Sequence, residues 1–307
     1  MNKAASFIVI GGANMDIAGK SLSSTSKASQ SQVGSIAKSS GGVARNIAET
    51  LGRLEQNVTL LSAFGDDEDS RQIMDELACV KVGYDISVIH KNTKADLYMA
   101  IYDKAGELIS AINDMPLIDT ITADLLAQHK AALLSADKIV IDANLSSEAI
   151  DAICKYAPQS YLAADAVSIT KAQKLKPYLS SLNLLKVTES EACQLIDHDQ
   201  TLTHDQLLHR LHKAGVTIIL LSLGEEGFIL STEHQRVYLK AQADIDIITI
   251  SGAGDGLFAG TLYGISQGYE LEIIAQIARR VAQTALTSPK AVSTNLNRQL
   301  VDPLIKA

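Results

Sequence analysis

Aromatic residues are scarce in this 307-residue chain, which has no Trp, 9 Tyr and 4 Phe. Surfaces that bind nucleic acid are usually basic and often stack bases on aromatic rings, whereas the formal net charge here is −8. The sequence also has no apolar run that approaches the roughly 20 residues of a membrane span. We therefore expect neither nucleic acid nor a membrane as a partner.

Cysteine is also rare, with Cys79, Cys154 and Cys193 widely spaced along the chain. Small disulfide-stabilised domains have even sets of closely spaced cysteines, so an odd and scattered set indicates reduced, structural thiols. The first apolar run, at residues 7–10, is too short for the core of a signal peptide. We expect a cytoplasmic protein.

Short apolar runs alternate with helix-like segments along most of the sequence. The apolar runs predict strands that are buried on both faces, at residues 7–10, 58–61, 138–142, 161–164, 183–187 and 217–221. Apolar residues with helical spacing predict helices at residues 43–54, 71–80, 123–135, 189–196 and 203–214. This alternation predicts an α/β fold with helices on both sides of a parallel sheet.

Two segments depart from this alternation. Residues 95–112 read as a hairpin with a glycine-containing turn, and residues 15–39 read as two strands around a polar centre or as a flexible loop. Together they could form a small antiparallel sheet that acts as a lid and excludes water from a transfer reaction. The predicted core is then residues 1–14, 40–94 and 113–307.

A tract of small residues near the C-terminus, Ser251-Gly252-Ala253-Gly254-Asp255-Gly256, is the most informative motif. An alternating apolar run at residues 245–250 precedes it and predicts a strand, and a helical pattern follows it. Backbone N–H groups at such a helix start attract a phosphate or an oxyanion. Asp255 would repel that anion, but it suits a base that accepts a proton from an attacking hydroxyl. The alternative is a capped helix with a glycine turn.

Two further tracts carry polar residues suited to a small ligand. Gly41 and Gly42 precede a helix in which Asn46 falls in the first turn, where it could bind vicinal hydroxyls; a plain glycine-rich helix start is the simpler alternative. Asn14 and Asp16 follow the first strand, at the sheet edge where α/β proteins bind ligands, although Asp16 could also serve as a turn or cap.

Together these tracts resemble the ribokinase-like (PfkB) carbohydrate and nucleoside kinases over essentially the whole chain. The resemblance implies a three-layer α/β/α sandwich with a mostly parallel central sheet and a small antiparallel β lid. It implies that ATP and Mg²⁺ are used, that Asp255 is the general base, and that the amides of Gly252, Ala253 and Gly254 form an anion hole. It assigns the acceptor substrate to Asn14, Asp16, Gly41, Gly42 and Asn46.

The resemblance also implies an ATP site. Its residues are Lys186, Thr188, Ser222, Gly224, Gly227 and Ser251, and Glu191 matches the glutamate associated with Mg²⁺. Thr188 departs from the family pattern, which has asparagine there, and Thr249 stands where a carboxylate is common. Lys186 and Arg45 are the candidates for a basic group on the phosphates.

Within the family, the sequence is most similar to pseudouridine kinases. Arg45 before Asn46 and the run Ala111-Ile112-Asn113-Asp114-Met115 carry this likeness. It implies phosphorylation of the 5′-hydroxyl of pseudouridine, with Asn113 at the nucleobase and a homodimer formed through the lid. The alternatives are a kinase for another ribonucleoside or a free sugar, and a non-catalytic ligand-binding protein with the same fold.

Overall fold

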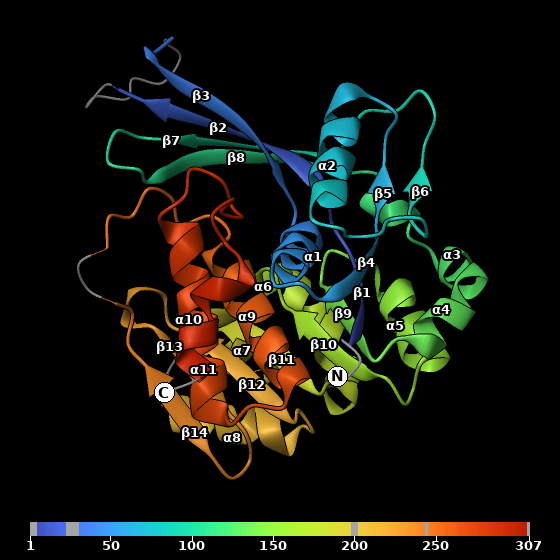
Figure 1. Cartoon of the computed structure of the whole chain (residues 1–307), viewed down its shortest axis with the longest axis vertical. Helices are drawn as coiled ribbons and strands as arrows, with labels where there is room; N and C mark the ends of the chain where they lie inside the picture. The colour runs from blue at the N-terminus through green and yellow to red at the C-terminus, as the bar shows by residue number, and fades with distance from the viewer. Residues whose placement is uncertain (1–4, 23–30, 198–201, 243–244, 306–307) are drawn as a thin grey trace.

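The computed structural model describes residues 5–22, 31–197, 202–242 and 245–305. They form a large sheet between two layers of helices, with a smaller sheet projecting from one end (Figure 1). The polar centre predicted at residues 21–32 lies largely outside the described residues.

The central sheet has eight strands in the order β14-β13-β12-β11-β10-β9-β1-β4. In chain order they are β1 (Ser6–Ile10), β4 (Asn57–Leu61), β9 (Lys138–Asp142), β10 (Tyr161–Asp165), β11 (Leu184–Thr188), β12 (Ile218–Ser222), β13 (Phe228–Ser231) and β14 (Arg236–Leu239). All neighbours from β4 to β12 are parallel, and β13 and β14 add an antiparallel edge. The six predicted strands are confirmed, because each predicted end lies within one residue of the observed one.

Alternation along the strands separates two hydrophobic cores. In β1, Phe7 and Val9 face one core, while Ile8 and Ile10 face the other. The first core is covered by α1 (Val43–Arg53), α2 (Glu68–Cys79), α9 (Ala253–Gln267), α10 (Leu271–Leu286) and α11 (Asp302–Ile305). The second is covered by α3 (Ala123–Gln128), α4 (Lys130–Ser135), α5 (Ser147–Tyr156), α6 (Ile169–Ala172), α7 (Glu189–Leu195) and α8 (His204–Lys213). The three-layer sandwich is therefore confirmed.

Short elements connect these layers. They are the two-stranded pair β5 (Ala63–Phe64) and β6 (Val88–Ile89), and the 3-10 helices η1 (Ile118–Thr120), η2 (Gln173–Ser181), η3 (Gly224–Glu226) and η4 (Arg298–Leu300).

Two helices differ in extent from the prediction. The helix predicted at 71–80 begins earlier, because Asp67 caps it by accepting a hydrogen bond from the Ser70 amide at 3.0 Å. The helix predicted at 123–135 is interrupted at His129, whose N–H bonds to the Leu126 carbonyl only three residues back. This tighter turn separates α3 from α4.

The smaller sheet has the order β3-β2-β7-β8, formed by β2 (Asn14–Ser21), β3 (Gly34–Gly41), β7 (Leu97–Tyr102) and β8 (Leu108–Asp114). Both hairpins, β2–β3 and β7–β8, are antiparallel, and they join through a parallel β2–β7 pair. The predicted small sheet is therefore present. Within the described residues it differs from the predicted antiparallel sheet only in the β2–β7 pair, which is parallel. We call these four strands the lid.

The strand predicted at residues 245–250 is wrong. The amides of Ile248 and Thr249 bond to the carbonyl of Leu286 at the end of α10, at 2.8 and 3.3 Å, instead of pairing with a neighbouring strand. Ile247, Ile248 and Ile250 are exposed, so their alternation buries no face of a sheet. Helix α9 therefore follows a loop.

Candidate active site

Helix α9 begins at a glycine that no other residue could replace without strain. Gly252 has φ 78°, in the left-handed region, and a Cβ there would lie 2.0 Å from the Ala291 carbonyl oxygen. Gly252 supplies no side-chain cap for this described helix. The first N–H groups of a helix have no intrahelical partner and are suited to an anion, although the Ala253 amide also donates to the Ile250 carbonyl at 3.5 Å.

Asp255 lies in the first turn of α9, opposite the first turn of α1. The Asn46 side-chain NH₂ donates to Asp255 Oδ2 at 2.8 Å, which brings together two motifs 209 residues apart. Burial raises the pKa of Asp255 from 3.8 to about 7; Asp165 and Asp142 add to the rise, while Asn46 and Lys186 oppose it. A carboxyl with this pKa can accept a proton near neutral pH.

Asp16 is a second carboxylate with a shifted pKa, at the beginning of the lid. Asn14 donates to Asp16 Oδ1 at 2.6 Å, and a Cβ on Gly41 would lie 2.1 Å from Asp16 Oδ2. Burial raises the pKa of Asp16 to about 6, against the lowering effects of Asn14 and Arg45. Gly42, with φ 96°, is equally restricted, because its Cβ would lie 2.4 Å from the Gly12 carbonyl oxygen. Both glycines thus permit close packing of the chain on itself beside Asp16.

The lid register places Asn113 in line with Asp16. Asp16 pairs with Ser39 and Tyr98, and Tyr98 pairs with Asn113, so the four residues form one row across the sheet. Residues directly opposite each other in paired strands project on the same face. Asn113, although exposed, therefore shares a face with Asp16.

Residues assigned to ATP lie around the end of β11. Lys186 Nζ is 3.2 Å from Asp165 Oδ2 on β10; burial would lower the pKa of Lys186, but Asp165, Glu191 and Asp255 outweigh it and raise the pKa. Lys186 Nζ also lies 3.4 Å from the position of a Cβ on Gly254, so it sits beside the first turn of α9.

Thr188 and Glu191 form a capping box at the start of α7. The Thr188 hydroxyl accepts from the Glu191 amide at 3.3 Å, and Glu191 Oε2 accepts from the Thr188 amide at 2.8 Å. This explains how threonine replaces the family asparagine without loss of the helix start. Clusters of three or more His, Cys, Asp or Glu side chains that could bind a metal are absent from the described parts of the chain.

The remaining predicted residues are on the neighbouring turns. Ser222 pairs with Thr188 at the end of β12, and Gly224 begins η3 and Gly227 follows it, with φ 59° and 111°. Ser251 precedes Gly252, and its N–H donates to Thr249 Oγ1 at 3.1 Å.

Asp142 and Asp165 are two buried carboxylates that the sequence analysis did not single out. Asp142 accepts hydrogen bonds from the amides of Gly12, Ala44 and Asn144 at 2.9–3.0 Å, and thus ties the ends of β1 and β9 to the start of α1. The sequence contains an indication of both residues, because an aspartate ends each of two neighbouring apolar strands. A single aspartate at the end of a strand is also typical of a turn or cap, so this pattern alone does not indicate a functional site.

Arg45 is not a group for the phosphates. Its side chain is 3% exposed, and its guanidinium binds Glu49 Oε2 at 2.6 Å and Glu76 Oε2 at 2.7 Å. Because two carboxylates already bind the guanidinium, Arg45 is not available to bind the phosphates, contrary to our expectation. Lys186 remains the candidate for the basic group on the phosphates.

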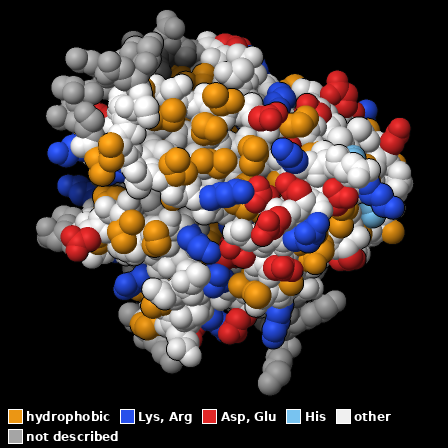
Figure 2. Space-filling view, turned by 90° about the horizontal axis from the view of Figure 1, so that it is seen from above, with side chains coloured by type: hydrophobic (Ala, Val, Ile, Leu, Met, Phe, Trp, Pro, Cys, Tyr) orange, Lys and Arg blue, Asp and Glu red, His pale blue; other side chains and the backbone are white. Residues whose placement is uncertain are grey.

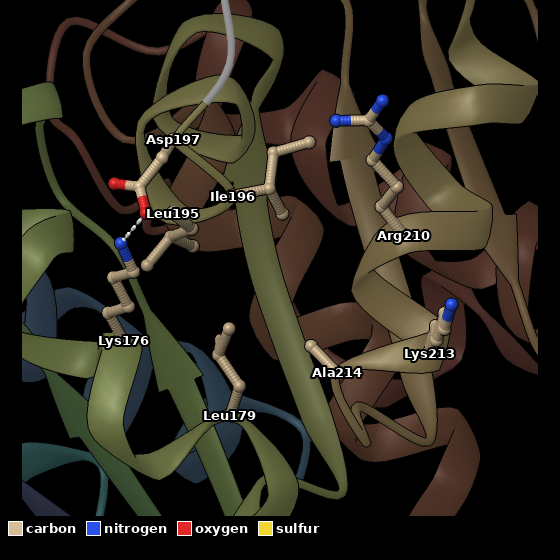
Figure 3. Close-up of a pocket in the computed structure, with 8 residues that line it drawn as sticks. All are labelled: Lys176, Leu179, Leu195, Ile196, Asp197, Arg210, Lys213 and Ala214. Atoms are coloured by element: carbon tan, nitrogen blue, oxygen red, sulfur yellow. Dashed lines mark hydrogen bonds and ion pairs between the residues drawn. The ribbon is translucent and has the colours of Figure 1, made fainter.

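A surface cavity of about 430 Å³ lies elsewhere, among η2, α7 and α8 (Figure 3). Lys176 and Asp197 pair on one side of it, and Arg210 and Lys213 lie across from them. None of the predicted site residues lines this cavity.

Comparison with known proteins identifies the family. The family model described as "pfkB family carbohydrate kinase" matches residues 4–298. The chain belongs to this family. Pseudouridine kinase from Escherichia coli K12 is 33% identical over 255 residues, which cover 82% of this chain and 81% of that protein.

Two solved structures share the fold. A carbohydrate kinase from Agrobacterium tumefaciens has a TM-score of 0.82 and 25% identity, covering 98% of this chain and 97% of that one. Ribokinase from Arabidopsis thaliana, solved with ribose and ATP, has a TM-score of 0.80 and 18% identity, covering 99% and 100%. Among the described helices, none combines the length and apolar character needed to cross a membrane.

Proposed function

We propose that this protein transfers the γ-phosphoryl group of ATP to the 5′-hydroxyl of pseudouridine, giving pseudouridine 5′-phosphate and ADP. The observation that carries this proposal is the half-buried Asp255, held by Asn46 in the first turn of α9 beside the first backbone amides of that helix. A proton acceptor beside an anion hole is what hydroxyl attack on a phosphate requires.

The predicted residues around Asp255 each have a step in this reaction. Asp16 and Asn46 hold the ribosyl hydroxyls, and Asp255 takes the proton of the 5′-hydroxyl as its oxygen attacks the γ-phosphorus. The amides of Ala253, Gly254 and Asp255 stabilise the negative charge on the transferred group. Lys186, beside Gly254, neutralises charge on the phosphates while ADP leaves. Closure of the lid, the four strands β2, β3, β7 and β8, excludes water.

The residues present fit a Mg²⁺ ion that ATP brings with it. Magnesium in kinases is held by one or two carboxylates together with substrate phosphates, so a preformed metal cluster is not needed. Glu191 uses only Oε2 in its capping box, and its carboxylate is close enough to Lys186 to affect the pKa of that residue. Glu191 would hold the ion through its other oxygen or through water, and the ion would neutralise phosphate charge.

Pseudouridine as the acceptor is supported by the relative from Escherichia coli and by the row from Asp16 through Tyr98 to Asn113. With the ribose at Asp16, a nucleobase would extend along this row, where the Asn113 amide can pair with the imide edge of uracil.

A substrate panel tests this choice of acceptor. We expect ADP release with pseudouridine to have a kcat/KM at least about 10-fold above ribose or purine nucleosides, because a missing hydrogen bond leaves polar groups unpaired. Uridine, which has the same imide edge, is measured beside them as the alternative acceptor. Asn113→Ala should remove most of this preference and leave the rate with ribose nearly unchanged. A faster reaction with another nucleoside or sugar would replace pseudouridine, and tight binding without ADP release would indicate a non-catalytic protein.

We further propose that two copies pair through the outer face of the lid. Successive residues of a strand project on opposite faces of the sheet, so the outer face of the lid is the one opposite Asp16. The residues on this outer face include Ile36, Ile101 and Ile112, which are 82%, 46% and 63% exposed. Figure 2 looks onto this end of the molecule and shows hydrophobic side chains gathered across it. Such a surface favours association, which the molar mass in solution measures.

We assign the reaction to the cytoplasm, because Cys79, Cys154 and Cys193 are all free thiols.

A further inference from the structure

Arg45 joins four acceptors around one buried guanidinium. Its Nη1 donates to the Ser40 carbonyl at 3.2 Å and to Asn46 Oδ1 at 3.0 Å, while its Nη2 binds Glu49 and Glu76. Asn46 in turn donates to Asp255. A continuous chain of contacts therefore runs from two carboxylates through Arg45 and Asn46 to the proposed base.

The chemistry of Arg45 settles which way the Asn46 amide points. A guanidinium has only donors, so the Asn46 atom that faces it must be the carbonyl oxygen. The NH₂ group then faces Asp255, where it donates to the carboxylate. Without Arg45 the amide could turn over and present its oxygen to Asp255, which would repel the ionised form of the base.

We propose that Arg45 is a positioning residue, which fixes the Asn46 amide so that its NH₂ group donates to Asp255. This inference rests on the proposed function, because it assumes that Asp255 is the base. Pairing with Glu49 and Glu76 alone would not require an arginine directly before Asn46, whereas this positioning role does.

The same network reaches the anion hole from the other side. Lys290 Nζ binds Glu76 Oε1 at 3.1 Å, and the next residue, Ala291, has the carbonyl oxygen against which Gly252 packs. Glu76 therefore joins Arg45 to the loop behind Gly252. Contacts through Glu76 and Lys290 therefore connect Arg45 to the loop that packs against the start of the proposed anion hole.

A double-mutant cycle on Arg45 and Asn46 tests the proposal, with Arg45→Gln, Asn46→Ala and the pair measured for kcat and for the KM of ATP. We expect Arg45→Gln to lower kcat about 10- to 100-fold with little change in the KM of ATP, as for other small misplacements of reacting groups. In the Asn46→Ala background the same change should have almost no further effect on kcat, because Arg45 acts through Asn46.

The pH profile gives a second readout. Asp255 is faced by Asn46 from α1 and by Asp142, Asp165 and Lys186 from β9, β10 and β11. Arg45→Gln changes none of these residues. If the Asn46 NH₂ group no longer donates to Asp255, the pKa of Asp255 rises, so the acidic limb of kcat/KM should move to higher pH.

Arg53→Gln is the matched control. Arg53 binds Glu49 Oε1 through Nε and Nη2 at 2.8 and 2.6 Å, on the same helix as Arg45. Its loss removes an ion pair to the same glutamate without changing any contact of Asn46, so we expect near-wild-type kcat. If Arg45→Gln fails to fold, Arg45→Lys keeps a positive charge beside Glu49 and is used in the same cycle.

The outcomes separate this inference from the proposed function. Independent effects of Arg45 and Asn46 that multiply in the double mutant, with Asp255→Asn inactive, would overturn the positioning role alone. Wild-type kcat in Asp255→Asn would overturn the base itself, whatever the Arg45 variants show.

Discussion

Replacement of Asp255 by asparagine is expected to lower kcat by about 10²- to 10⁴-fold, the usual contribution of a general base. Asparagine has nearly the same shape and can still accept the hydrogen bond from Asn46, but it cannot take the proton of the hydroxyl. The KM of ATP should change little, because the helix amides and Lys186 remain in place. Coupled measurement of ADP release at saturating acceptor gives both constants.

The same variant should be more stable than the wild type above pH 7. The folded-state pKa of Asp255, about 7, is above its ordinary 3.8, so the folded protein binds this proton more tightly and loses stability as pH rises from about 4 to 7. Asparagine removes that loss, and we expect Tm at pH 8 to rise by roughly 2 °C or more, but not at pH 4. An active variant, or an inactive one that is unfolded at pH 8, would contradict the assignment of Asp255 as the base.

Replacement of Gly252 by alanine is expected to lower kcat by about 10²-fold or more, the effect of losing an oxyanion donor. The new Cβ would lie 2.0 Å from the Ala291 carbonyl oxygen, a backbone atom that cannot move alone. The first turn of α9 must therefore shift, and the amides of Ala253 and Gly254 shift with it. Steady-state kinetics and thermal unfolding measure the two consequences.

Gly268→Ala is the control at the other end of the same helix. Gly268 also adopts the left-handed conformation, with φ 72°, but among described atoms nothing lies within 4 Å of its Cβ position. Both variants bear the backbone strain of about 1–2 kcal/mol, and only Gly252→Ala adds the clash. Equal activity in the two variants would show that the turn before α9 does not form an anion hole.

The fold was largely predictable because burial on both faces gives the central strands near-continuous apolar sequences, as at Leu184–Thr188 and Ile218–Ser222. The run at residues 245–250 looked similar and was misread. Ile248 and Thr249 of this run bond to Leu286 at the end of α10, 38 and 37 residues later, and a local pattern contains no information about such a contact. The parallel pairing of β2 with β7 depends on residues even farther apart, such as Asp16 and Tyr98.

The candidate site was predictable where its residues are close in sequence. Gly252 to Asp255 form one tract, and so do Gly41 to Asn46. Their meeting at the Asn46–Asp255 hydrogen bond followed only from the structure. Arg45 shows most clearly what the sequence could not predict. An arginine next to a glycine turn suits phosphate binding, but in the structure its guanidinium is paired with Glu76 on another helix.

The pH dependence of kcat/KM for the acceptor, measured with Mg·ATP saturating, tests the central claim most directly because it reports ionisations of the free enzyme. We predict a fall below pH about 7 as Asp255 is protonated, steepening below about 6 as Asp16 follows, and no inflection near 7 in the residual activity of Asp255→Asn. A wild-type profile that is flat from pH 5 to 8.5 would show that no such carboxylate takes the proton.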